Sequence, residues 1–319
     1  MESIACTTPI QQMKYDDGEN TFFIKRDDLL PFSFGGSKVR IAEHYFKDLE
    51  AKGCNCAITY GGSRSNINRV MANMCKAKGL ECRVVMSADE DGTMAETCNS
   101  RIIRQLGIEP ICCDKSRVCE TVGSVMDDCR LKGLKPYYIY GDIHGSGNDH
   151  IAVPAYIEAY DEIQSCETAA GREFDYIFHA SATGITQSGL ICGKLKHHGN
   201  ARIVGISVAR THGQVRALIA DNVKKALGCE GGAHLDENIY VEDRYICGGY
   251  GRYDDRIMKS IREVLNSDGI PLDTTYTGKA FWGMGEYLKQ HGVKGARVLF
   301  IHTGGLPLFF DDIRNHEGL

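Results

Sequence analysis

Residues 57–86 read AITYGGSRSNINRVMANMCKAKGLECRVVM. An apolar, β-rich run at 57–60 ends in two glycines, a helix-period segment covers 66–78, and a second apolar run follows at 82–86. Two strands joined through a helix form a crossover connection, which places the strands side by side in a parallel sheet. This stretch therefore predicts an α/β fold.

The same alternation of strand and helix continues along nearly the whole chain. Strands are predicted at 21–24, 57–60, 82–86, 108–112, 137–140, 176–180, 203–208 and 298–302. Helices are predicted at 39–51, 66–78, 94–106, 116–131, 151–165, 186–197, 214–227, 254–266 and 278–290. This regularity is typical of open, twisted parallel sheets with helices on both faces. Residues 52–150 contain β–α units of their own, so we expect a small α/β domain inserted in a large domain of 1–51 and 151–319.

The composition excludes several classes of protein. Of the 319 residues, 43% are hydrophobic and 25% charged, and the net charge of −5 leaves no basic field for nucleic acid or an anionic membrane. The first residues lack the pattern of a secretory leader, and no apolar run is long enough to span a bilayer, so we expect a cytoplasmic protein. Its 14 Cys residues include no C-x-x-C pair, which argues against a metal site and favours small buried side chains in a reducing compartment.

Glycine-containing turns precede several predicted helices, where ligands of doubly wound sheets collect. Lys38 follows two glycines and Ser37 at a helix start, a position that disfavours a cation. It is either a solvated lysine or an amine with a depressed pKa or a covalent role. Ser65, in GGSRSN at 61–66, either only caps the next helix or also helps to bind a substrate carboxylate.

Three later turns also carry candidate residues. SATGIT at 181–186 could surround a phosphate with backbone N–H groups and hydroxyls, although it has neither a Walker loop nor a G-x-G-x-x-G pattern. YTGK at 276–279 and HTGG at 302–305 either cap helices or line a site. His302 is either a core histidine or part of that site.

Together and in this order, these motifs resemble one family. The chain is similar to the pyridoxal-phosphate (PLP) enzymes of the tryptophan-synthase-β-like fold (fold type II), in the branch of D-cysteine desulfhydrases and 1-aminocyclopropane-1-carboxylate (ACC) deaminases. The resemblance rests on TPI (8–10), IKRDDL (24–29), GGSKVR (35–40), GGSRSN, ATGIT (182–186), GGYG (248–251), YTGK and HTGG. It implies a two-lobed α/β fold, a PLP cofactor and a small amino-acid substrate, and it suggests a homodimer.

The resemblance also implies roles for single residues. Toward the cofactor, Lys38 would attach it covalently and Asn66 would hydrogen-bond its phenolic oxygen. Its phosphate would be bound by Thr183, Gly184, Ile185 and Thr186. Its pyridine nitrogen would lie near Thr277 and Thr303. Toward the substrate, Ser65 would bind the carboxylate with Asn66 beside it, and Tyr250 and Tyr276 would line the reacting centre. Arg64, next to Ser65, is counted among the substrate-binding residues for its own charge.

The pair Thr277 and Thr303 narrows the expected chemistry. ACC deaminases of the family are expected to have Glu and Leu there, whereas desulfhydrase-like members have hydroxyls. A carboxylate would keep the pyridine nitrogen protonated and strengthen the electron sink, which a neutral hydroxyl need not do. The resemblance thus predicts a lyase that eliminates a β-substituent, as a D-cysteine desulfhydrase does, to give pyruvate and ammonium. Either the freed Lys38 or Tyr276 would remove the Cα proton.

Other functions stay open. A β-replacement synthase would use the same residues up to a shared aminoacrylate, an ACC deaminase is a further alternative, and a non-catalytic ligand-binding protein could keep the fold. The chain also departs from the family pattern. Ser37 replaces an Asn, Arg64 a Gln, Ile41 a Lys, and Ala182 and Ile185 replace glycines. Arg64 either points to solvent or pairs with a second anionic group of the substrate.

Overall fold

The computed structural model describes residues 6–88, 92–228 and 235–315. The chain divides into two compact units: unit 1 contains Lys38–Ala152, and unit 2 contains the segment that ends at Ser37 and the segment that begins at Val153. Helix α1 (Ser37–Ala51) groups with unit 1 from Lys38 onward, whereas residues 1–51 were predicted to belong to the large domain. The limits of the domains as independent bodies stay a prediction.

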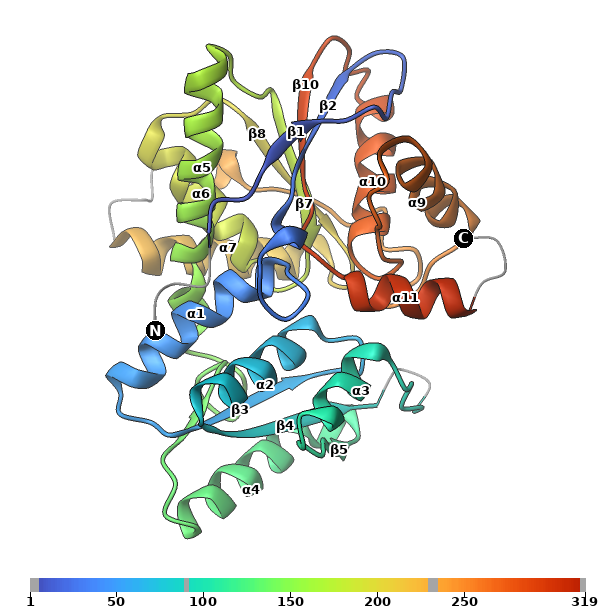
Figure 1. The fold of residues 1–319 in the computed structure, drawn as a ribbon. Helices are drawn as coiled ribbons and strands as arrows, with labels where there is room; N and C mark the ends of the chain where they lie inside the picture. The colour runs from blue at the N-terminus through green and yellow to red at the C-terminus, as the bar shows by residue number, and fades with distance from the viewer. Residues whose placement is uncertain (1–5, 89–91, 229–234, 316–319) are drawn as a thin grey trace. The chain divides into compact units, whose positions relative to one another are not determined.

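Unit 2 is built on a six-stranded sheet of order β1-β2-β10-β7-β8-β9 (Figure 1). Its strands are β1 (Ile10–Gln12), β2 (Thr21–Lys25), β7 (Tyr176–Ser181), β8 (Arg202–Ser207), β9 (Tyr240–Glu242) and β10 (Arg297–Ile301). The β1–β2 pair is antiparallel and the other pairs are parallel. Ile301 pairs with both Lys25 and His179, so the loops after β2, β7 and β10 leave the same edge of the sheet.

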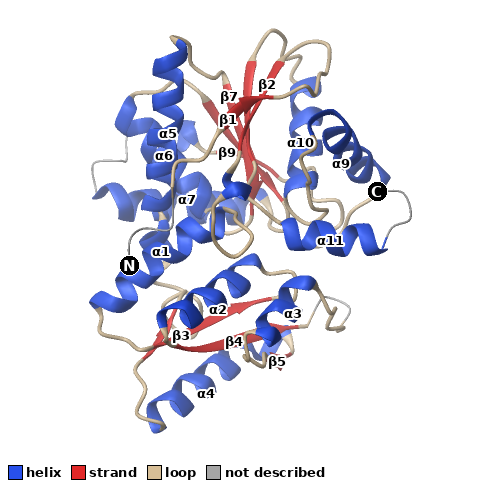
Figure 2. Cartoon of the chain, in the orientation of Figure 1, coloured by secondary structure: helices blue, strands red, loops and turns tan. Residues whose placement is uncertain are grey.

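Helices cover both faces of this sheet (Figures 1 and 2). One face carries α5 (Pro154–Ala170), α6 (Ile185–His197) and α7 (His212–Leu227), and the other carries α9 (Asp255–Asp268) and α10 (Thr277–Gln290). Short helices η1 (Asp27–Leu29), α8 (Leu235–Asn238) and α11 (Leu306–Asn315) complete the unit. Phe281 and Met284 of α10 are buried in one core with Phe178 and Phe300 of the sheet. Burying such a side chain contributes about 1.5–3 kcal/mol, so this packing fixes α10 on the sheet.

Unit 1 has an all-parallel sheet of order β5-β4-β3-β6. Its strands are β3 (Cys56–Gly61), β4 (Glu81–Ser87), β5 (Ile111–Cys113) and β6 (Pro136–Tyr138). Helices α2 (Asn66–Lys78) and α3 (Cys98–Gln105) lie on one face and α4 (Val118–Leu131) on the other (Figure 2). The 3-10 helices η2 (Lys115–Arg117) and η3 (Asp149–Ala152) lie before α4 and at the end of the unit.

The predicted α/β class, with parallel sheets covered by helices, is confirmed. The prediction was wrong at the start of α3, which begins at Cys98 rather than at residue 94. The reason is local, because the Thr97 side chain accepts a hydrogen bond from the Ser100 N–H and so forms the N-cap. The short strands β1 and β9 and the helices α8 and α11 were not predicted.

The expectation for the cysteines holds only in part. Cys82 and Cys192 are buried as predicted, and the Cys56 and Cys129 sulfurs lie 3.6 Å apart in the core of unit 1, where burial raises the pKa of the Cys56 thiol. Other cysteines, such as Cys119, are exposed. In the part of the chain that the structure describes, no group of three or more His, Cys, Asp or Glu side chains is placed to hold a metal ion. A search of the same residues finds no helix with the length and apolarity needed to cross a membrane.

Candidate active site

The loop after β7 leads from Ser181 into the N-terminus of α6. Gly184 forms the N-cap with φ +80°, and no side chain caps the helix, so the first N–H groups lack a side-chain acceptor. The Ser181 hydroxyl, at the end of β7, is buried and has no hydrogen-bond partner among the described residues. Unpaired donors at the positive end of a helix dipole are suited to a phosphate. Ala182 and Ile185 have no positive φ, so their replacement of glycines causes no backbone strain.

The loop after β10 holds the backbone that immediately precedes Lys38. The Ser37 N–H donates to the Thr303 carbonyl oxygen over 2.9 Å. A β-carbon at Gly36, where φ is +99°, would lie 2.8 Å from the same oxygen, so this close approach requires glycine. The start of α1 is thus fixed to the HTGG loop.

His302 in turn fixes the HTGG loop. Its Nε2 lies 2.7 Å from the Pro271 carbonyl oxygen, and its Nδ1 accepts from the Gly304 N–H at 3.2 Å. Because one nitrogen must donate and the other accept, these bonds assign a neutral imidazole with its proton on Nε2. His302 is therefore a hydrogen-bonded core histidine that shapes the loop of Thr303.

Residues of the KRDDL motif (25–29) hold the same turn by hydrogen bonds. The Asp27 carbonyl oxygen accepts from the Gly36 N–H at 2.8 Å, and its carboxylate accepts from the hydroxyls of Thr8 and Tyr156, each at 2.8 Å. The buried Lys25 ammonium donates to Thr8 at 2.6 Å. The motif therefore fixes the conformation of the turn that precedes Lys38.

Lys38 lies in the first turn of α1 with its side chain half-buried. Its ammonium forms no hydrogen bond or ion pair with any residue that the structure describes. Burial lowers the pKa of Lys38 to about 8, so a larger share of the amine is uncharged near neutral pH than in an exposed lysine. An unpaired, partly uncharged amine is the form that condenses with an aldehyde.

The turn before α10 is organised by the buried carboxylate of Asp273. Its Oδ1 accepts from the N–H groups of Thr275 and Tyr276 at 2.9 and 2.8 Å. Its Oδ2 accepts from the N–H of Thr277 at 3.1 Å and from the Thr277 hydroxyl at 2.7 Å. Burial raises the pKa of Asp273, and the hydrogen bonds from Thr277 and Tyr276 oppose that rise. Both Tyr276 and Thr277 are therefore positioned by one carboxylate.

The two threonines differ in what they can still bind. The Thr277 hydroxyl gives its proton to Asp273, so its oxygen can only accept from a further group. The Thr303 hydroxyl is half-buried and makes no hydrogen bond to another described residue, so it can still donate as well as accept.

Tyr276 meets a second tyrosine. The hydroxyl oxygens of Tyr250 and Tyr276 are 2.5 Å apart, and their rings pack edge to face. Tyr250 belongs to a loop that lacks regular structure, and Lys279 of α10 holds this loop by donating to the carbonyl oxygens of Ile246 and Gly249, both at 2.7 Å. Lys279 is fully buried, and desolvation lowers its pKa to about 8.

In unit 1 the turn after β3 carries Ser65 and Asn66. The Ser65 oxygen accepts from the Asn68 N–H at 3.4 Å, so Ser65 caps α2 and keeps its own proton to donate. The Asn66 Oδ1 accepts from Asn99 Nδ2 at 3.0 Å and from Arg69 Nη2 at 3.4 Å. These two donors assign the orientation of the amide and leave its Nδ2 group as the donor for a ligand.

The predicted site residues thus fall into two sets, one in each unit. Unit 2 carries Thr183, Gly184, Ile185, Thr186, Tyr250, Tyr276, Thr277 and Thr303, and unit 1 carries Lys38, Arg64, Ser65 and Asn66. Asn99 and Asp273 were not predicted, whereas Ser181 and Lys279 lie in the predicted turns SATGIT and YTGK without a role of their own assigned there. Asp273 had a local signal, because an Asp shortly before a helix commonly accepts from its first N–H groups.

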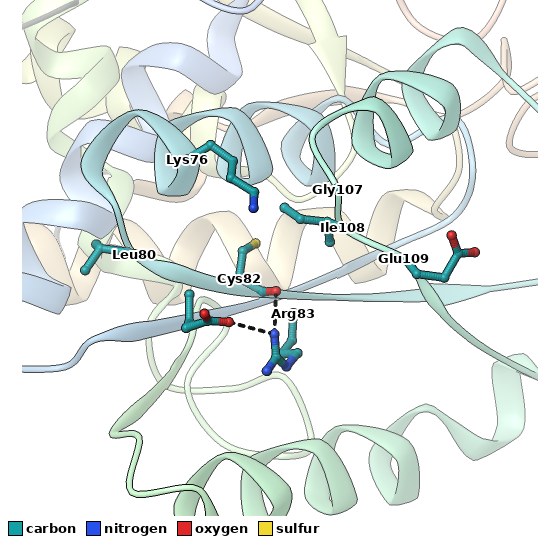
Figure 3. Close-up of a pocket in the computed structure, with 8 residues that line it drawn as sticks. Lys76, Leu80, Cys82, Arg83, Gly107, Ile108 and Glu109 are labelled. Carbon is teal, nitrogen blue, oxygen red and sulfur yellow. Dashed lines mark hydrogen bonds and ion pairs between the residues drawn. The ribbon is translucent and has the colours of Figure 1, made fainter.

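An open depression in unit 1 lies away from these residues (Figure 3). It is lined by Lys76, Leu80, Glu81, Cys82, Arg83, Gly107, Ile108 and Glu109. Figure 3 shows the Arg83 guanidinium paired with Glu81, at 2.9 Å, and with the Cys82 carbonyl oxygen. Glu81 and Cys82 begin β4, so the depression lies at the amino end of a strand, opposite the edge where ligands of such sheets collect. We assign no ligand to it.

Comparison with known proteins identifies the group that these donors suit. A family model described as "Pyridoxal-phosphate dependent enzyme" matches residues 4–304. The chain belongs to this family. Among the described residues, the unpaired amine of Lys38, the free Nδ2 of Asn66 and the unsatisfied Ser181 hydroxyl beside α6 fit an aldehyde, a phenolic oxygen and a phosphate, three of the polar functions of PLP.

Relatives of this PLP-dependent enzyme carry two names. A protein of Pyrococcus horikoshii, named provisionally as an ACC deaminase, is 32% identical over 311 residues, which cover 96% of this chain and 91% of the relative. A D-cysteine desulfhydrase of Klebsiella pneumoniae is 29% identical over 97% of this chain and 95% of its own. A crystal structure of an ACC deaminase homologue matches with a TM-score of 0.82 and 29% identity, over 98% of this chain and 95% of that one. The predicted fold type II family, its branch and its cofactor are confirmed.

Proposed function

We propose that this enzyme catalyses α,β-elimination on a small β-substituted amino acid, as a D-cysteine desulfhydrase does, and releases pyruvate and ammonium. One observation carries the proposal: hydroxyls stand at both positions assigned to the pyridine nitrogen, and neither Thr277 nor Thr303 brings a carboxylate there. The Thr303 hydroxyl can donate to an unprotonated nitrogen, which gives a moderate electron sink. Such a sink is sufficient for the loss of a good β-leaving group. It favours this elimination more than the ring opening of ACC.

The donors described above support the residues that we assign toward the cofactor. PLP supplies the conjugated system that takes up negative charge from Cα. We assign its covalent attachment to Lys38 and its phenolic oxygen to Asn66. We assign its phosphate to Thr183, Gly184, Ile185 and Thr186, and we add the Ser181 hydroxyl to this set. In these assignments no cationic side chain contacts the phosphate.

Binding of the substrate is assigned to the turn after β3. Ser65 keeps a proton that it can donate to the α-carboxylate while its oxygen caps α2. The N-terminus of α2 adds a positive dipole for the same anion. Arg64 and Asn66 flank Ser65 in this turn.

Proton transfer is assigned to Lys38 and Tyr276. The Lys38 amine, with a pKa near 8, is suited to take the Cα proton at neutral pH. Tyr276 then protonates the leaving group, and a hydrogen bond from Tyr250 makes its hydroxyl a better donor. With cysteine the Cβ–S bond breaks, and addition of water yields pyruvate, ammonium and hydrogen sulfide in equal amounts.

Assay of pyruvate from D-cysteine, L-cysteine and β-chloroalanine, with and without an added thiol, tests the proposal. We expect pyruvate without the thiol. Turnover only with a second nucleophile would contradict a lyase and favour a β-replacement synthase. Lys38→Ala should lose both activity and the visible absorbance of lysine-bound PLP, and a wild type without that absorbance would instead indicate a non-catalytic protein. The cytoplasmic location and the homodimer stay predictions.

A further inference from the structure

Arg64 is a cation without a counter-ion in the turn that carries Ser65. Its Nη1 is buried and has no hydrogen-bond partner, and no carboxylate pairs with its guanidinium, among the residues that the structure describes. The neighbouring Ser63 hydroxyl is also buried without a partner. Because buried guanidinium N–H groups are normally paired, these donors indicate an anionic ligand.

The backbone of the turn around Arg64 is held by two hydrogen bonds, although the Arg64 guanidinium has no partner among the described residues. The Thr97 hydroxyl donates to the Ser63 carbonyl oxygen at 2.7 Å, and Asn99 Nδ2 donates to the Arg64 carbonyl oxygen at 3.2 Å. The carbonyl groups of Ser63 and Arg64 are thus held by the N-cap and the first turn of α3, whereas Arg64 Nη1 has no partner among the described residues. An unpaired guanidinium on a backbone that is held in this way is suited to bind an oxyanion through two parallel hydrogen bonds.

Two other arginines of unit 1 are each paired with a nearby acid. Arg83 pairs with Glu81 at 2.9 Å, and Arg101 pairs with Glu96 at 2.7 Å. Arg64 lies beside the residue assigned to the α-carboxylate and has no such acid among the described residues. The unpaired charge is therefore located in the proposed substrate site.

We propose that Arg64 binds an oxyanion carried on the substrate's β-carbon, so that the preferred substrates are amino acids whose β-leaving group is an oxyacid. The sulfonate of cysteate and the phosphate of O-phosphoserine have this chemistry. The inference rests on the proposed elimination and specifies its substrate class.

The reaction with cysteate requires no oxidant or reductant. The Cβ–S bond breaks and its electron pair leaves with the sulfur, the Cα proton goes to the base, and water is added. Cysteate and water thus give pyruvate, ammonium and bisulfite. Because negative charge on the departing group grows as the bond breaks, a guanidinium there stabilises the transition state more than the bound substrate.

The test compares wild type with Arg64→Gln, which keeps a polar side chain and removes the charge. Arg83→Gln, the same change in a paired arginine of unit 1, is the control. We expect Arg64→Gln to lower kcat/KM for cysteate and O-phosphoserine about 10- to 100-fold, the loss expected for hydrogen bonds to a charged group. It should change kcat/KM for β-chloroalanine less than about threefold, because chloride needs no such partner.

A binding measurement without turnover accompanies the assay. 3-Sulfopropanoate lacks the amino group and cannot react, so calorimetry reports its contacts alone. We expect it to bind wild type and Arg83→Gln more tightly than propanoate does, and Arg64→Gln to lose that difference. If wild type eliminates β-chloroalanine but neither oxyacid substrate, the inference is wrong and the elimination stands. An equal loss on all substrates would also overturn it. No pyruvate from any substrate would contradict the proposed function itself.

Discussion

The hydroxyl of Tyr276 lies 2.5 Å from that of Tyr250, although 26 residues separate them in the chain. Neither hydroxyl is placed by its own element alone. Asp273 fixes the backbone of Tyr276, and Lys279 fixes the loop of Tyr250. Two buried charged residues therefore set the geometry of the proposed proton donor.

Removing each hydroxyl should separate the roles of the pair. Tyr276→Phe should lower kcat with cysteine by about 10²–10⁴, the usual loss for a general acid, and should lower kcat with β-chloroalanine much less because chloride leaves without a proton. Tyr250→Phe should cost roughly tenfold with cysteine, since it removes one hydrogen bond to the donor. Steady-state kinetics with both substrates checks this, and equal losses on the two substrates would exclude Tyr276 as the acid.

Lys279 should act through the loop of Tyr250. Lys279→Met leaves the carbonyl oxygens of Ile246 and Gly249 without their donor, so we expect kcat to fall at least as far as in Tyr250→Phe. The thermal midpoint should fall as well, because hydrogen bonds to a charged group contribute about 1.5–3 kcal/mol. Lys289→Met, on the exposed face of the same helix, is the control and should change neither. A Lys279→Met enzyme with wild-type kcat would refute this positioning role.

How far the sequence predicted the fold depended on whether each signal was local. Helix α2 was predicted with its observed limits because Ser65 caps its start and Gly79, with φ +66°, ends it. Strands β1 and β9 have three residues each and owe their conformation to pairing with β2 and β8, which no local pattern reports. Helix α11 was missed although it follows the HTGG motif directly.

The site shows the same division. Glycine-rich turns and strand ends indicated Lys38 and the loop before α6. The partners of Lys279 are backbone carbonyls 30 and 33 residues away. Every residue has such a carbonyl, so the sequence does not indicate which ones accept a hydrogen bond. The orientation of Asn66 likewise depends on Asn99, which lies 33 residues further along the chain.

Asn99 should affect cofactor affinity without touching the cofactor. Asn99→Ala removes a donor to Asn66 Oδ1, so the Asn66 amide loses its fixed orientation and PLP should bind roughly tenfold more weakly, the equivalent of one hydrogen bond. Titration of the apoenzyme with PLP, followed by fluorescence, measures the Kd. Asn200→Ala, an exposed Asn in unit 2, should leave the Kd unchanged. An unaltered Kd in Asn99→Ala would refute this orienting role.

The lowered pKa of Lys38 predicts how cofactor loading depends on pH. Because burial moves that pKa from 10.5 to about 8, the uncharged amine should rise from roughly a tenth of the molecules at pH 7 to about half at pH 8. The rate at which apoenzyme gains the absorbance of lysine-bound PLP should rise over this interval and level off above about pH 9. A rate that still climbs tenfold per pH unit above pH 9 would indicate an unperturbed lysine.

Elimination in preference to ring opening is the central claim, and a competition between substrates tests it most directly. Wild-type enzyme is given D-cysteine, L-cysteine, cysteate and ACC in parallel, and the 2-oxo acid from each is identified by mass. We predict pyruvate from at least one β-substituted substrate, with a kcat/KM at least a hundredfold above that for any 2-oxobutanoate formed from ACC. Turnover of ACC to 2-oxobutanoate as the faster reaction would contradict the account.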